Sequence, residues 1–104
     1  MTSDNTRFHE IIQTEGRLDR DRRLILFLRE RIAESADTAT ERERALLAAV
    51  GRILAHFADG FEAAALRDSA NGVFGHYEAL GWSLRCTAFA AFSEHPGFSP
   101  DWRP

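Results

Sequence analysis

The clearest pattern along the chain is a run of apolar residues at helical spacing that begins after Thr40. Thr40 and Glu43 have the spacing of a capping box, in which each side chain satisfies a free backbone amide at a helix start. The apolar stripe that follows comprises Leu46, Leu47, Val50, Ile53, Leu54 and Phe57. Gly60 is placed to end this helix. We predict a short helix over 61–67 and a turn over 69–72, because asparagine and glycine tolerate a positive φ.

The first 34 residues predict two further helices. A short one, capped by Asp4 or Asn5 and ended by Gly16, would carry apolar residues on one side: Phe8, Ile11 and Ile12. A second, capped by Asp19, has Leu24, Ile25, Leu28 and Ile32 at helical spacing. The run LILFL (24–28) is also compatible with a buried strand, but charged helix formers flank it without a turn signal. The helix is therefore favoured.

The segment from Val73 to Ser93 predicts a helix that is apolar on more than one side. One face carries Phe74, Tyr77, Leu84, Ala88 and Phe92, and a second carries Trp82, Cys86 and Phe89. Such a helix is typically central in a bundle. Gly81 is a candidate for a close contact between helices, and Pro96 ends the element.

These elements predict the fold class. Runs of β-branched residues are few, and there is no two-residue hairpin signal. We expect one all-α domain over residues 1–104, a small helical bundle of three to five helices with an extended aromatic C-terminal tail over 93–104.

The tail, SEHPGFSPDWRP, raises the question of what its aromatic residues contact. Proline makes an extended segment less costly to order, so Phe98 and Trp102 can lie in an apolar groove. The groove belongs either to the same bundle, near Trp82 or the second predicted helix, or to another protein. Tryptophan and arginine are frequent at interface hot spots. The intramolecular alternative is favoured, because a free Trp and Phe would promote aggregation.

Composition narrows the class of protein. With 44% hydrophobic and 28% charged residues the chain is expected to be globular. Apolar runs such as Leu24 to Leu28 are too short to span a membrane, and the N-terminus lacks the apolar core of a signal peptide. A single cysteine, Cys86, fits a reducing compartment. We therefore expect a cytoplasmic protein with no membrane partner.

The candidate chemistry does not indicate an enzyme. The possible metal ligands are His9, His56, His76, Cys86 and His95, and their spacing matches no common zinc motif. There is no GxSxG elbow, P-loop or GxGxxG fingerprint. Carboxylate pairs such as Asp19/Asp21 alternate with arginines, which favours ionised groups over general acid–base catalysis. We expect no enzymatic activity, cofactor or metal.

An arginine cluster keeps nucleic acid as an alternative partner. Arg17, Arg20, Arg22 and Arg23 would attract phosphates, although Asp19 and Asp21 cancel about half of this charge. The chain as a whole has a net charge of −3, and all 13 of its basic residues are arginine. Coding bias explains the absence of lysine more simply than function does. Nucleic acid is therefore the less favoured partner.

Residues 83–104 resemble a known family. Ser83, Leu84 and Arg85, then HPGF (95–98) and WRP (102–104), are similar to the C-terminal signature of the actinobacterial and actinophage domain-of-unknown-function family 6221. The FLRERI segment (27–32) resembles that family's opening helix. The resemblance implies an actinobacterial or phage setting and supplies no activity. Many relatives carry extra cysteines, whereas this chain has Cys86 alone.

Together these observations predict a non-enzymatic protein-interaction or regulatory protein. It would bind a protein, from the host or as a homo-oligomer with itself, through helical apolar faces and its tail. The predicted partner-binding residues are Trp82, Arg85, Phe89, Phe98, Trp102 and Arg103.

Overall fold

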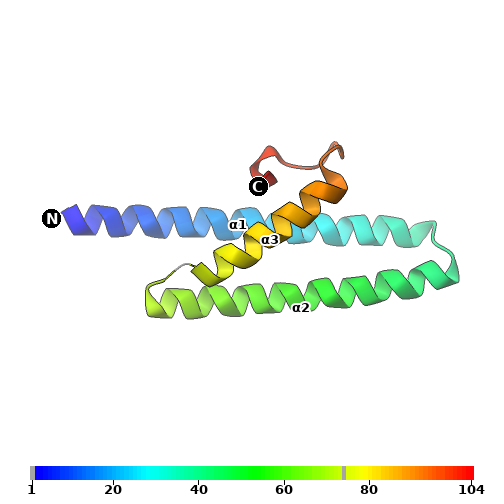
Figure 1. The fold of residues 1–104 in the computed structure, drawn as a ribbon, viewed down its shortest axis with the longest axis horizontal. Coiled ribbons are helices and arrows are strands. Elements are labelled where there is room, and N and C mark those ends of the chain that lie inside the picture. The colour runs from blue at the N-terminus through cyan, green and yellow to red at the C-terminus, as the bar shows by residue number, and fades with distance from the viewer. Residues whose placement is uncertain (1, 74) are drawn as a thin grey trace.

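The residues that the structure describes form two long helices and one shorter helix. A computed structural model describes residues 2–73 and 75–104, with side chains described from residue 16 onward except at residue 74. Helices α1 (Thr2–Asp37) and α2 (Glu41–Asn71) form an antiparallel hairpin, which α3 (Gly75–Phe92) crosses diagonally (Figure 1). A 3-10 turn, η1 (Pro100–Trp102), lies near the C-terminus. The described residues contain no strand, which confirms the all-α prediction.

Both ends of α2 have the local chemistry that the sequence indicates. The Thr40 hydroxyl accepts a hydrogen bond from the Glu43 backbone amide at 3.2 Å, as predicted for the cap. The Glu43 carboxylate accepts the Thr40 hydroxyl at 3.0 Å, whereas a complete capping box would use the Thr40 amide. The helix ends at Gly72, whose φ of 67° is left-handed and favours glycine.

Two glycines predicted to end helices lie inside them instead. Gly16 is in α1 and Gly60 is in α2. The four helices predicted before the turn at 69–72 are therefore joined into two longer helices. An interior glycine costs only about 1 kcal/mol relative to alanine. In α2, packing on both sides of Gly60 outweighs that cost, because Leu54, Phe61 and Ala64 are buried. Asp19 likewise caps nothing and pairs with Arg23 at 3.1 Å within α1.

The bounds of the outer elements also differ from prediction. Helix α1 begins at Thr2, so the predicted caps Asp4 and Asn5 lie inside it. The side chains predicted to form its apolar side, Phe8, Ile11 and Ile12, are outside the described side chains. Helix α3 begins at Gly75, two residues later than predicted. Phe74, which was predicted to lie on one apolar face of this helix, is outside the described residues.

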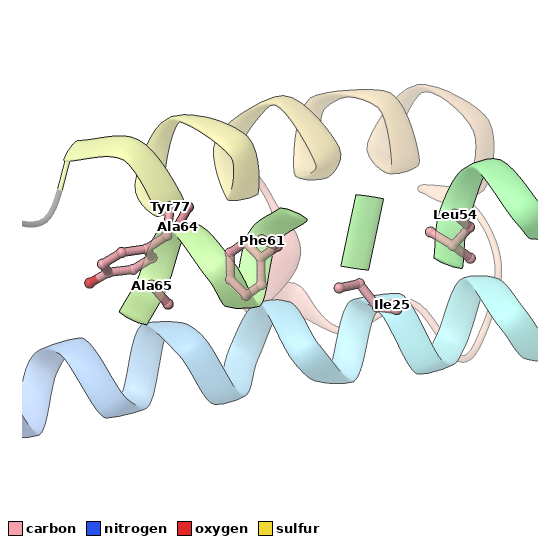
Figure 2. Packing of buried hydrophobic residues seen from close by; sticks show 6 residues of the cluster. All are labelled: Ile25, Leu54, Phe61, Ala64, Ala65 and Tyr77. Carbon is pink, nitrogen blue, oxygen red and sulfur yellow. The ribbon is translucent and has the colours of Figure 1, made fainter. Parts of the chain in front are cut away.

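The core consists of two adjoining clusters. The first draws residues from all three helices and contains Ile25, Leu54, Phe61, Ala64, Ala65 and Tyr77 (Figure 2). The rings of Phe61 and Tyr77 meet edge to face at 6.1 Å, which fixes the start of α3 on α2. The second joins α1, α3 and the tail through Leu24, Phe27, Ala88 and Trp102. Each large side chain that is fully buried contributes about 1.5–3 kcal/mol.

Helix α3 crosses α1 at Gly81, which confirms the predicted close contact. A Cβ atom at Gly81 would overlap the carboxylate of Asp21 on α1. That carboxylate is buried and accepts two hydrogen bonds from Arg85 Nη1, each 2.9 Å long. Glycine is needed here because any side chain would displace this ion pair.

The length of α3 decides how much of the hairpin it covers. Its 18 residues span about 27 Å, whereas the 31 residues of α2 span about 46 Å. It starts on α2 at Tyr77 and ends on α1 at Ala88. The N-terminal half of α2, near the loop that joins it to α1, therefore lies beyond the cover of α3 (Figure 1).

Candidate functional site

An apolar groove lies where α3 leaves α2 uncovered. Its cavity volume is about 410 Å³, and apart from Arg31 and Ser35 its lining is apolar. Helix α1 contributes Leu28 and Ile32, and α3 contributes Leu84 and Phe92. The wall on α2 consists of Leu47, Val50, Ile53, Leu54 and Phe57. We call this feature the α2 groove.

Three aliphatic side chains of α2, in or next to the wall of the α2 groove, form its rim and are more exposed to solvent than is usual for apolar residues. Leu46 is 66% exposed, Val50 41% and Ile53 68%. All three belong to the apolar stripe that the sequence predicts along this helix. Exposed aliphatic residues that adjoin one another, instead of standing singly, are typical of interaction sites.

Farther along α2 the same stripe is covered. Phe61 and Ala64 continue it at helical spacing, and both are almost fully buried under α3. The change from covered to open occurs near Phe57, which is half-buried. The stripe is therefore one continuous apolar face, of which this chain covers only the C-terminal half.

The segment 45–51 of α2 carries no polar side chain on any side. Its sequence is ALLAAVG, two helical turns between Arg44 and Arg52. A helix that is apolar all round is ordinarily buried. Here every residue of the segment is exposed except Leu47 and Gly51, which are half-buried.

Arg31 forms the polar edge of the α2 groove and is held in place from several directions. Its guanidinium lies 4.6 Å from the centre of the Phe27 ring, a cation–π contact. Arg31 Nε is 3.0 Å from a carboxylate oxygen of Glu34, and Nη1 is 3.1 Å from His95 Nε2. The hydroxyl of Ser35, the other polar lining group, donates to the Arg31 carbonyl at 2.9 Å.

The C-terminal tail packs against its own chain. The Phe27 ring is surrounded by Phe92, His95, Phe98 and Trp102, with ring centres 5.1 to 6.0 Å away. Trp102 is buried, and its indole Nε1–H donates to the Arg20 carbonyl at 3.0 Å. The tail thus rests on the part of α1 that was predicted as the second helix.

The six residues predicted to bind a partner do not form one continuous surface. Arg85 and Trp102 are buried within the chain. Phe89, Phe98 and Arg103 lie together: the two rings are 6.2 Å apart and the guanidinium is 5.9 Å from the Phe89 ring. Trp82 is exposed and lines a polar cleft with arginines of α1.

The predicted arginine cluster is neutralised by carboxylates. Arg17 pairs with Glu78 on α3, Arg20 with Asp21, and Arg23 with Asp19. Arg22 binds Glu62 on α2 through two hydrogen bonds, of 2.6 and 2.8 Å. These hydrogen bonds raise the pKa of Arg22 and lower the pKa of Glu62. Each arginine of the cluster therefore has an acidic partner before any phosphate approaches.

Asp68 is a buried carboxylate that stabilises the start of α3. Its Oδ2 accepts the backbone amides of His76 at 2.9 Å and Tyr77 at 3.1 Å, so it caps the first turn of α3. Its Oδ1 is 2.6 Å from His76 Nδ1. Burial alone would raise the pKa of Asp68, but these hydrogen bonds outweigh it and hold the pKa below the ordinary value.

Among the described residues, the other candidate metal ligands do not cluster. Within the part of the chain that the structure describes, no three His, Cys, Asp or Glu side chains gather as a metal site would require. Cys86 is half-buried on α3. None of the described helices has a stretch both long and apolar enough to cross a bilayer.

No family model, curated protein or solved structure matches the chain. The resemblance of residues 83–104 to family 6221 stays a prediction.

Proposed function

We propose that this chain is a non-enzymatic protein-interaction module, and that the α2 groove is its docking surface. The observation that carries this proposal is the open half of the α2 stripe, where Leu46, Val50 and Ile53 continue a buried core face into solvent. Covering an apolar side chain contributes about 1.5–3 kcal/mol. A partner that covers these three residues therefore gains binding free energy from burying their side chains.

The shape of the surface favours a helical partner. Leu46, Val50, Ile53 and Phe57 follow one another at intervals of three or four residues along a straight helix. Such a row accepts an amphipathic helix whose own anchors recur at the same spacing. Farther along the same face α3 packs in this way, so the docked helix would complete a layer that α3 leaves unfinished.

The lining of the α2 groove supports binding over catalysis. Its polar side chains are Arg31, which is engaged by Glu34 and Phe27, and Ser35, whose hydroxyl bonds to the backbone. Nucleophilic or acid–base chemistry needs a base within hydrogen-bonding reach of the reacting group. The described lining offers no such pair.

The C-terminal tail contributes to this function indirectly. With Trp102 buried on α1, the tail anchors the end of α3 and so fixes one wall of the groove. Trp82, Phe89 and Arg103 remain accessible as secondary contacts. An actinobacterial or phage setting is part of the proposal and rests on the resemblance of residues 83–104; a regulatory role would follow from partner binding.

The alternative, a nucleic-acid-associated regulator that uses Arg17 to Arg23, has less support. Phosphate binding depends on cations that release counterions from the nucleic acid. Here binding would first have to displace Glu78, Asp21, Glu62 and Asp19 from the four arginines.

Site-specific photo-crosslinking tests the proposal in cells. A photoreactive residue at Ile53 should capture a protein, whereas the same residue at Leu66 should not. Leu66 is a matched control because it lies on α2, is 74% exposed and is outside the groove. Equal capture at the two positions, or none at Ile53, would contradict the proposal.

A further inference from the structure

We propose that the helix docked on the α2 groove is α2 of a second copy of this chain. In this arrangement the two α2 helices run antiparallel about a two-fold axis close to Val50. The inference rests on the proposed docking function and names its partner. Three features of the described residues support it.

The first feature is the spacing of the exposed side chains. Leu46 and Ile53 are seven residues apart, two helical turns, so they lie on nearly the same side of α2. When two copies pair antiparallel, Leu46 of each copy faces Ile53 of the other and Val50 lies beside the axis. The surface is thus complementary to itself, as a two-fold interface requires.

The second feature is the size of the neighbouring residues. Ala45 and Ala49 stand next to the exposed stripe, within the segment that has no polar side chain. Small residues let two helix axes approach to about 8–10 Å, at which side chains interdigitate. The exposed Leu46 and Ile53 of one copy can then enter the α2 groove of the other, with no polar group to desolvate on the segment 45–51.

The third feature is charge. The turn before the segment contains Glu41, Arg42, Glu43 and Arg44, which sum to zero, and the residues after it include one cation and one anion, Arg52 and Asp59. Antiparallel pairing places these two neutral regions beside each other, so self-association meets no net repulsion. A strongly charged foreign helix, by contrast, would gain no electrostatic attraction from these flanks.

The predicted contact covers only a few helical turns on each copy. Stable interfaces usually bury about 800 Å² per partner, more than this segment alone supplies. We therefore expect a dissociation constant on the order of micromolar or weaker, and a dimer that forms with rising concentration.

Sedimentation equilibrium over a concentration series tests the proposal. The wild-type chain should pass from monomer to dimer, and Ile53→Glu should raise the dissociation constant at least about a hundredfold, because each dimer loses two buried side chains. Leu66→Glu, on the same helix but outside the groove, should leave it unchanged. Ile53 is largely exposed, so circular dichroism should show that both variants stay folded.

A cysteine placed at the axis gives an independent measurement. In a Cys86→Ser background, Val50→Cys should form a disulfide-linked dimer on mild oxidation, whereas Leu66→Cys should not. Symmetry-related cysteines near the axis are close enough for the short Cβ–Cβ distance that a disulfide requires.

The outcomes separate the two proposals. A chain that stays monomeric up to about millimolar concentration, or a dimer that Ile53→Glu does not weaken, overturns the second copy as occupant. If the photoreactive residue at Ile53 then captures a different protein, the docking function stands with another partner. If it captures nothing, both proposals are wrong.

Discussion

The substitution Gly81→Ala tests the packing that positions α3. It adds a single methyl group where α3 crosses α1. The new Cβ would overlap Oδ2 of Asp21 and lie 3.0 Å from its Cγ and 3.4 Å from Arg85 Nη1. The buried carboxylate would therefore have to move away from its arginine partner.

The expected loss of stability follows from two opposing effects. Alanine favours a helix interior by about 1 kcal/mol over glycine. Overpacking a buried site typically costs about 1–3 kcal/mol, and breaking a buried ion pair costs about 3–5 kcal/mol. Because the carboxylate can shift part of the way without leaving Arg85 entirely, we expect a net loss of about 1–3 kcal/mol.

Gly60→Ala is the matched control. Gly60 also lies inside a helix, but a Cβ there would have no neighbour within 4 Å. The same chemical change should therefore stabilise the chain by about 0.5–1 kcal/mol. The two variants should shift in opposite directions in urea denaturation followed by circular dichroism. Thermal midpoints should move by roughly 4–8 °C per kcal/mol for a domain of this size. If Gly81→Ala is as stable as Gly60→Ala, the close crossing at Gly81 is wrong.

Other substitutions test the tail, the cap of α3 and the open rim. Trp102→Ala should lower the free energy of unfolding by about 3–5 kcal/mol in urea denaturation, because a buried indole and its hydrogen bond are lost; a loss below about 1 kcal/mol would mean that the tail is not packed. The depressed pKa of Asp68 gives stability that is present above its ordinary value of 3.8 and lost as the pH falls through the lower folded value. In Asp68→Asn the free energy of unfolding should therefore fall less steeply on acidification below about pH 4 than in the wild type. An equal fall in both proteins would contradict the capping role of Asp68. In dilute solution Ile53→Gln should change the stability by less than about 0.5 kcal/mol, whereas Leu54→Ala next to it should cost about 2–5 kcal/mol; similar losses at both positions would show that the rim is not open.

Local chemistry made much of the secondary structure predictable. The cap at Thr40 and the left-handed residue at Gly72 depend on neighbours within a few residues, and both follow from the sequence. The merging of helices across Gly16 and Gly60 does not. An interior glycine costs about 1 kcal/mol, and whether that ends a helix depends on packing along its whole length.

The buried acidic residues could not be assigned from the sequence. Asp21 stands among arginines and looks like a member of a solvated helix start, yet its partner Arg85 is 64 residues away. Asp68 likewise caps a helix that begins after the turn. Only the crossing of α3 over the hairpin brings these groups together.

The α2 groove was only partly predictable. Periodicity identifies Leu46, Val50 and Ile53 as an apolar face, but it does not say whether the same chain covers that face. Cover depends on the length and direction of α3. One signal was present: the segment 45–51 has no polar side chain on any side and requires more apolar cover than one neighbouring helix provides.

The stripe on α2 is open to solvent in the isolated chain. In our proposal a docked helix covers it. Methyl NMR with a soluble paramagnetic agent measures this at two adjacent residues. In dilute solution the methyl signals of Ile53, which is 68% exposed, should broaden strongly, while those of Leu54, which is 8% exposed, should be spared. As the protein concentration rises, the broadening at Ile53 should decrease. Equal protection of Ile53 and Leu54 in dilute solution would contradict the account.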